Sequence, residues 1–501
     1  MSIEKTKLNY LCKGKLEEEQ VMVEALLNVP DLEKLLWVEA DASIDSVSPA
    51  EAELAFTGQV HIFGAYLDAE KKIKPYENVS PFMGKIVNNQ LNTSASVNLV
   101  ANTRGVEFAE KSGKIECLVA VNGDFVLVNQ TEILCGGDDR VCVKTEEISS
   151  QELLKADNFV FNEEISYPIN DKMDNILRVE SKVCLKSIIA EENLFSVSGE
   201  IYTTIKYINT NEELQTISCV SFSEPFKREI EAIGLDANGV VRAIASVDKS
   251  SYKYELDKEV NKILITVPIK IAYRAYQDIT LPYAVDAFGM DANLGITTTS
   301  LEKSIAQTQE FFEAKVEGSV QIDSNAPRID KVIGFSSPMH TITAVEYSSG
   351  KVYIEGIAVF SITYLNDELE DLASIKEEMP FRVGISADSP LNTVIFVKSE
   401  MVDVDVVARR GREVFFDGKL KVQICTKKEI CDAVITELEL KEPLPPKSHA
   451  IEIYFGKKGD DLWQIAKELK VSPDVIQSQN QGLVLPLEQS ENIVIYNSKT
   501  R

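Results

Sequence analysis

The segment Gly199-Glu-Ile-Tyr-Thr-Thr-Ile-Lys-Tyr207 decides the fold class of this chain. Alternate residues of a strand lie on one face, and here one face runs from Gly199 through Ile201 and Ile205 to Tyr207. Segments with the same Gly-to-Tyr spacing begin at Gly58 and Gly356. The alternation predicts β-strands at all three places.

Further landmarks surround each of these segments. In each of the three copies, an acidic residue and an apolar pair precede the Gly-to-Tyr segment, and a Pro-Phe pair follows it. The apolar pairs are Leu35-Leu36, Ile176-Leu177 and Val332-Ile333, and the closing pairs are Pro81-Phe82, Pro225-Phe226 and Pro380-Phe381. The period of about 141 to 156 residues far exceeds that of solenoid repeats, so we expect each copy to be a domain with its own core.

We therefore predict a mainly β chain with three repeated antiparallel domains, each a sandwich or an open barrel. The predicted domains span residues 15–150, 151–295 and 296–442. Helical patterns are few in this part of the chain, and Leu301–Phe312 is the best candidate for a helix. A proline-rich linker at residues 443–448 separates the repeats from a different segment at residues 449–497.

Charge and composition exclude several classes of function. The chain has 501 residues, with 52 Lys and Arg against 79 Asp and Glu, so its net charge is −27. Phosphate backbones and anionic membrane surfaces repel such a chain, so we expect no nucleic-acid partner. No apolar run approaches the ~18 residues of a membrane span, and an apolar signal core is missing, so we expect a cytoplasmic protein.

The residues that carry chemistry are sparse or scattered. The three histidines, His61, His340 and His449, are far apart, and the eight cysteines show no CxxC spacing, so we expect reduced thiols. The sequence contains no nucleophile elbow and no phosphate-binding loop, and no carboxylate pair stands out among the many acidic residues. We predict a protein that is not an enzyme and needs neither a cofactor nor a metal.

The segment after the linker has the pattern strand, helix, helix, strand. Ile451–Phe455 and Ile493–Tyr496 alternate like strands, and apolar residues repeat at helical spacing over Leu462–Leu469. Asp460 is the expected N-cap of this first helix. Ser472-Pro473 begins the second helix.

The string Gly459-Asp-Asp-Leu-Trp-Gln-Ile-Ala466, with Asn480 and the closing Ile493-Val-Ile495, resembles a LysM module. This resemblance implies a βααβ domain that binds N-acetylglucosamine-containing glycans between the first helix and the loop after the second. The three large repeats resemble the SPOCS domains of sporulation proteins. Three such domains followed by one LysM module resemble the SipL-type spore-coat morphogenetic proteins.

The family resemblance implies a partner and a location. The LysM module would bind the coat-basement ATPase of the SpoIVA type at the forespore surface inside the mother cell, and other coat proteins are further candidate partners. The alternative is a cell-wall protein that binds peptidoglycan or chitin oligomers. A wall hydrolase is a third class, but residues 1–440 lack a catalytic constellation for it.

All candidate partner-binding or glycan-binding residues lie in the LysM-like segment. They are Gly459, Asp460, Leu462, Trp463, Ile465 and Asn480. Trp463 is either an exposed aromatic anchor for a partner or a helix residue packed against the strands. For Asp460 an N-cap role is favoured over ligand contact, and for Asn480 bracing of the following loop is favoured.

Overall fold

The computed structural model describes residues 3–29, 31–109, 113–168, 173–209, 215–257, 259–260, 262–366, 371–386, 393–409, 411–447 and 449–496. Strands make up most of these residues, and all strand pairs are antiparallel. The prediction of a mainly β chain is confirmed.

The strand pairings divide the long β region into three units, each with two sheets. The first unit comprises β1 (Lys5–Leu26), β2 (Leu32–Ala50), β3 (Glu53–Asp68), β4 (Ile73–Val87), β5 (Ser96–Ala109) and β6 (Lys114–Leu134). Its sheets have the strand orders β1-β6-β5 and β2-β3-β4.

The second and third units are built in the same way. The second comprises β7 (Val141–Pro168), β8 (Met173–Glu191), β9 (Leu194–Asn209), β10 (Thr216–Glu231), β11 (Val240–Val247), β12 (Lys253–Asp257) and β13 (Lys262–Gly289). The third comprises β14 (Ala292–Gln321), β15 (Ile329–Phe335), β16 (Met339–Ser348), β17 (Lys351–Asn366), β18 (Leu372–Ser386), β19 (Thr393–Arg409) and β20 (Glu413–Pro443). Their sheets are β10-β9-β8, β11-β13-β12 with β7 on β13, β14-β20-β19, and β15-β17-β16 with β18 on β17.

Each unit buries an apolar core between its two sheets. In the second unit, Phe195 from β9 and Tyr273 from β13 meet with ring centroids 5.0 Å apart. In the third unit, Phe360 from β17 and Phe416 from β20 meet at 5.1 Å. Each pair joins one residue from each sheet, so the apolar core of these two units lies between their sheets.

One residue from each apolar pair of the sequence motif contributes to a cluster shared by the three units. Leu36, Leu177 and Ile333, the second residue of each pair, belong to one buried cluster. Of the residues that follow the three tyrosines, Leu67 and Ile208 belong to the same cluster, and the partly buried Leu365 packs against it. Every unit therefore contributes corresponding side chains to a shared core. The units are joined here through apolar burial, which is the main favourable term in association.

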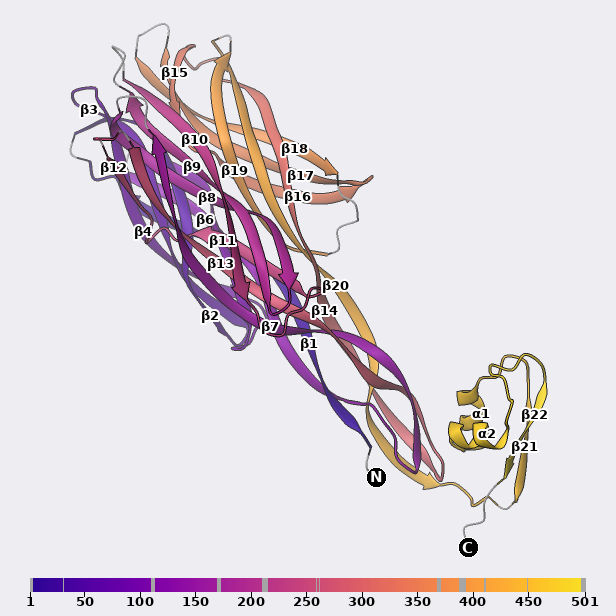
Figure 1. Ribbon diagram of the computed structural model, residues 1–501. Coiled ribbons are helices and arrows are strands. Elements are labelled where there is room, and N and C mark those ends of the chain that lie inside the picture. The colour runs from indigo at the N-terminus through magenta and orange to yellow at the C-terminus, as the bar shows by residue number, and fades with distance from the viewer. Residues whose placement is uncertain are drawn as a thin grey trace.

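Long antiparallel strand pairs extend from the three units and pack together as a twisted stem (Figure 1). These pairs are β1–β6, β7–β13 and β14–β20, and they share buried clusters such as Leu8, Ile133, Ile148, Leu301 and Val434. The stem gives the three units a second common core. No sequence pattern in the repeats had indicated this sharing.

One secondary-structure prediction is wrong. Leu301–Phe312 lies within β14 and pairs with β20, where Leu301 faces Asp432 and Phe312 faces Val422. A bulge between Ala306 and Gln309 interrupts the strand alternation. The interrupted pattern resembles helical spacing, and long-range pairing with β20 overrides it.

The C-terminal unit lies beside the far end of the stem (Figure 1). It comprises β21 (Ile451–Gly456), α1 (Leu462–Leu469), α2 (Pro473–Gln479) and β22 (Glu491–Tyr496), and β21 pairs with β22. Its core is made by the helices and β22, with Ile465, Ala466, Ile476 and Ile493 fully buried. Its assignment to the LysM family stays a prediction.

Candidate functional site

The first helix of the C-terminal unit begins one residue later than the predicted cap. Asp461 is the N-cap of α1, and its carboxylate accepts a hydrogen bond from the Gln464 backbone N–H at 2.7 Å. The Gln464 side chain accepts in return from the Asp461 N–H, which completes a capping box. The prediction that Asp460 caps this helix is therefore wrong.

Asp460 instead holds the turn before α1. Its carboxylate accepts hydrogen bonds from the Tyr454 hydroxyl at 3.0 Å and from the Lys457 N–H at 2.8 Å. Gly459 occupies the left-handed region with a φ of +97°, and its N–H donates to the Leu487 carbonyl at 2.8 Å. Both residues therefore stabilise the conformation of the loop before α1.

Three other candidate residues also have structural contacts. Asn480 donates to the carbonyls of Ile476 and Val494 and accepts from the Val494 N–H, each at 2.9 Å, so it braces the region after α2 against β22. Ile465 is fully buried, and Leu462 packs against the same core. Asn480 and Ile465 thus serve the internal structure of the unit.

Trp463 is half-buried, and besides packing against the core of its own unit it contacts the second unit. Its indole N–H donates to Oδ2 of Asp286 at 2.8 Å, and its ring lies 5.1 Å from that of Phe288. Asp286 and Phe288 belong to β13, at the far end of the stem. Trp463 thus packs against strands, but those strands belong to the second unit.

Two lysines complete this contact between the helix and the stem. Lys467 donates to both oxygens of Asp286, at 2.8 and 2.7 Å, and the Lys470 ammonium lies 5.6 Å from the centre of the Phe288 ring. Partial burial raises the pKa of Asp286, but Lys467 and the Trp463 N–H outweigh it, so this pKa is lower than usual. We call Trp463, Lys467, Asp286 and Phe288 the docking contact.

Sequence reasoning missed an exposed apolar face on the C-terminal unit. Ile451, Ile453 and Phe455 of β21 are 53, 51 and 72% exposed, and Tyr496 of β22, which pairs with Ile451, is 57% exposed. Helices cover one side of a two-stranded sheet, so the other side stays open. The available signal was the set of apolar residues at alternate positions, Ile451, Ile453 and Phe455. We call these four residues the open sheet face.

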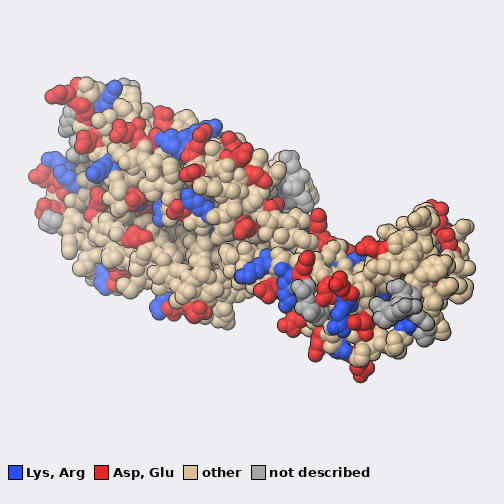
Figure 2. Space-filling view, turned by 60° about the horizontal axis from the view of Figure 1, so that its bottom comes forward, with Lys and Arg blue, Asp and Glu red and all other residues tan. Residues whose placement is uncertain are grey.

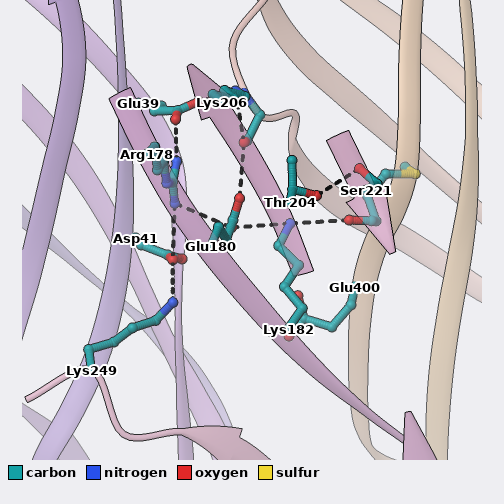
Figure 3. Close-up of polar contacts among 12 residues, drawn as sticks. Glu39, Asp41, Arg178, Glu180, Lys182, Thr204, Lys206, Ser221, Lys249 and Glu400 are labelled. Atoms are coloured by element: carbon teal, nitrogen blue, oxygen red, sulfur yellow. Dashed lines mark hydrogen bonds and ion pairs between the residues drawn. The ribbon is translucent and has the colours of Figure 1, made fainter. Parts of the chain in front are cut away.

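A second cluster of functional interest joins the three large units (Figure 3). Arg178 of β8 forms ion pairs with Glu39 of β2, with Asp41 at 3.3 Å and with Glu180 at 3.2 Å. Glu180 also accepts from the Ser337 hydroxyl of the third unit at 3.0 Å. This buried charge cluster therefore ties together residues from all three units.

The charge cluster holds fixed charges. Burial disfavours ionisation of Glu39 and Glu180, but Arg178 and neighbouring lysines outweigh it and lower the pKa of both acids. Burial likewise opposes the Arg178 charge, but Glu180, Glu39 and Asp41 raise its pKa. None of these groups is close to exchanging a proton near neutral pH, as a general acid or base must.

The remaining chemistry-bearing residues give little support to catalysis. His340 contacts the Ser399 hydroxyl at 2.9 Å, but burial lowers its pKa to about 4, which makes it a weak base. All eight cysteines are free of disulfides, and burial raises the pKa of Cys117 and Cys184 to about 12. Within the described ranges, no three His, Cys, Asp or Glu side chains are grouped to hold a metal.

No helix in the described part of the chain has the length and apolar character that crossing a membrane requires. Searches against protein-family models and curated proteins find no match to this chain.

Proposed function

We propose that this chain is a non-enzymatic assembly protein of the SipL type, with three SPOCS-like units and a C-terminal LysM-like unit. In this proposal it binds the coat-basement ATPase of the SpoIVA type at the forespore surface, inside the mother cell. The three large units share buried apolar clusters, and in this proposal the C-terminal unit makes the partner contact.

The open sheet face is the observation that supports this proposal most strongly. Ile451, Ile453, Phe455 and Tyr496 expose large apolar side chains side by side on a unit of about fifty residues, whereas soluble proteins rarely leave such surfaces without a partner. Aromatic residues are frequent among the side chains that dominate binding energy. We therefore propose that this face takes part in binding, together with Trp463 on α1.

The position of the C-terminal unit also favours a binding role. It lies beyond the narrow part of the molecule, which Figure 2 shows between the large body and the small unit. The linker residues Pro443, Pro445 and Pro446 are exposed. The stem contacts this unit through α1, so the exposed side of β21 and β22 is left for a partner.

Glycan binding has less support. The residues that the LysM resemblance places near a glycan groove, Gly459, Asp460 and Asn480, are committed to hydrogen bonds within the unit. If calorimetry on the full chain detected binding to chitin oligomers or peptidoglycan, the glycan-binding function would be favoured over the protein-binding one.

Affinity purification from sporulating cells tests the proposal. The bait is the full chain, and the control is a chain that ends at Glu442. We expect the ATPase to be recovered with the full chain and to be lost with the control. Equal recovery with both baits would place the contact in the three large units and contradict the proposed function.

A further inference from the structure

The docking contact depends on an irregularity in β13. The register of β13 against β7 shifts between Ala284 and Asp286, so Val285 is an extra residue in the strand. Alternate residues of a regular strand share a face, and Ala284 is buried in the stem core. Without the bulge, the side chain of Asp286 would lie on the same face of β13 as Ala284 and would point into the stem core. The bulge therefore turns Asp286 and Phe288 toward α1.

The facing surface of α1 is complementary to these two residues. It presents an aromatic ring and two cations, Trp463, Lys467 and Lys470, on a chain whose net charge is −27. Such a surface is suited to a carboxylate and a neighbouring aromatic ring. Asp286 and Phe288, two residues apart on β13, supply both groups.

The docking contact combines a partly exposed ion pair with a buried ring, because Phe288 belongs to the same apolar cluster as Ile465 and Ile476. The side chains of Lys467 and Asp286 are 44 and 30% exposed, and ion pairs of this kind contribute little stability. Phe288 is the one part of the contact that is almost fully buried, at 2% exposure. The exposed linker keeps the C-terminal unit close to the stem even when the contact opens, so the contact can re-form within the molecule.

We infer that the α1 surface is an exchangeable binding surface for a protein segment that carries a carboxylate two residues before an aromatic ring. Asp286 and Phe288 occupy this surface until a partner segment of the same chemistry displaces them. The identity of that partner rests on the proposed function, but the exchange itself does not. Binding through this surface releases the C-terminal unit from the stem.

A peptide with the sequence of Leu281–Met290 tests the exchange. The peptide carries a fluorescent label and is titrated up to about 1 mM into the full chain and into an opened full chain that carries Asp286→Ala and Phe288→Ala. The Asp286→Asn chain is a milder variant, because it keeps the size of the side chain. Far-UV circular dichroism establishes that each variant is folded.

We expect the opened chain to bind the peptide with saturation. The unaltered chain should bind about tenfold more weakly or less, because its own strand occupies the surface, and Asp286→Asn should lie between them. A peptide whose aspartate and phenylalanine are replaced by asparagine and alanine should not bind. Absence of binding to the opened chain, or equal binding to opened and unaltered chains, would overturn the inference.

Binding of the ATPase to the opened and unaltered chains distinguishes failure of this inference from failure of the proposed function. The opened chain should bind the ATPase more tightly than the unaltered chain does. If the opened chain binds the peptide and neither chain binds the ATPase, the proposed partner is wrong and the exchange stands. If both chains bind the ATPase equally, the partner does not use the α1 surface and the inferred competition is wrong.

Discussion

The ring of Phe226 lies against the backbone of Gly199, its cross-strand neighbour in the second unit. A Cβ atom at Gly199 would be 2.7 Å from Cε1 of Phe226 and 2.5 Å from the Cys184 carbonyl oxygen. The pairs Gly58–Phe82 and Gly356–Phe381 are cross-strand neighbours in the same way. The glycine and the Pro-Phe pair of the sequence motif are thus one packing feature, with the ring covering the strand where a side chain is missing.

Replacing Gly199 with alanine should therefore destabilise the second unit. Neither the Cys184 carbonyl nor the Phe226 ring can yield without moving a strand, so we expect a loss of about 1–3 kcal/mol. The midpoint of urea unfolding, compared between the variant and the unaltered chain, measures this loss of stability. Gly105→Ala is the matched control, because nothing lies within 4 Å of a Cβ at that position. An unchanged midpoint for Gly199→Ala would show that the contact is not restrictive.

Removing Arg178 should weaken the junction of the three units. Arg178→Ala leaves the buried Glu39 and Glu180 carboxylates without their main counter-charge, so we expect a loss of about 3–5 kcal/mol by urea unfolding. Lys85→Ala, which breaks the exposed pair with Glu53, should cost less than about 1 kcal/mol. Similar effects of the two substitutions would contradict a joining role for the charge cluster.

The docking contact should open in acid. The pKa of Asp286 is below its usual 3.8, so its ionised form stabilises the contact. This stabilisation is complete above the usual value and is lost as the pH falls through the lowered pKa. In a Trp37→Phe chain, Trp463 emission should stay constant from about pH 8 to about pH 5 and shift to the red below about pH 4. Asp286→Asn should remove this transition, and an unchanged transition in that variant would exclude Asp286 as its source.

The open sheet face should affect binding and not stability. Ile453→Thr combined with Phe455→Ser changes side chains that are already exposed, so we expect the free energy of unfolding to change by less than about 0.5 kcal/mol. Recovery of the ATPase in a pull-down should fall by about tenfold or more. Met83→Thr, at an equally exposed apolar residue of the first unit, should leave recovery unchanged. Full recovery with the double variant would exclude this face.

Local patterns in the sequence predicted much of the local structure. Period-2 alternation located the long strands such as β9, and apolar periodicity located α1, because burial on one face selects the residues of that face. The spacing alone did not locate the helix start, since Asp460 and Asp461 are both good caps. Tyr454 and Lys457 donate hydrogen bonds to the Asp460 carboxylate, so Asp461 is the residue that caps α1.

Local sequence patterns could not predict the contacts between distant parts of the chain. Asp286 and Trp463 are separated by 177 positions, and the single-residue bulge at Val285 that turns Asp286 has no composition signal. Arg178 and Glu39 are common residue types in a charged chain and lie on different units. Such pairs meet only when whole sheets pack, so their roles become visible in the structure and not in the sequence.

Equilibrium binding of the purified ATPase tests the proposed function most directly. The ATPase is titrated into the full chain and into the chain that ends at Glu442, and binding is followed by calorimetry. The proposed function predicts saturable binding to the full chain and no measurable binding to the shortened chain. Equal affinity for both chains, or binding to neither, would contradict it.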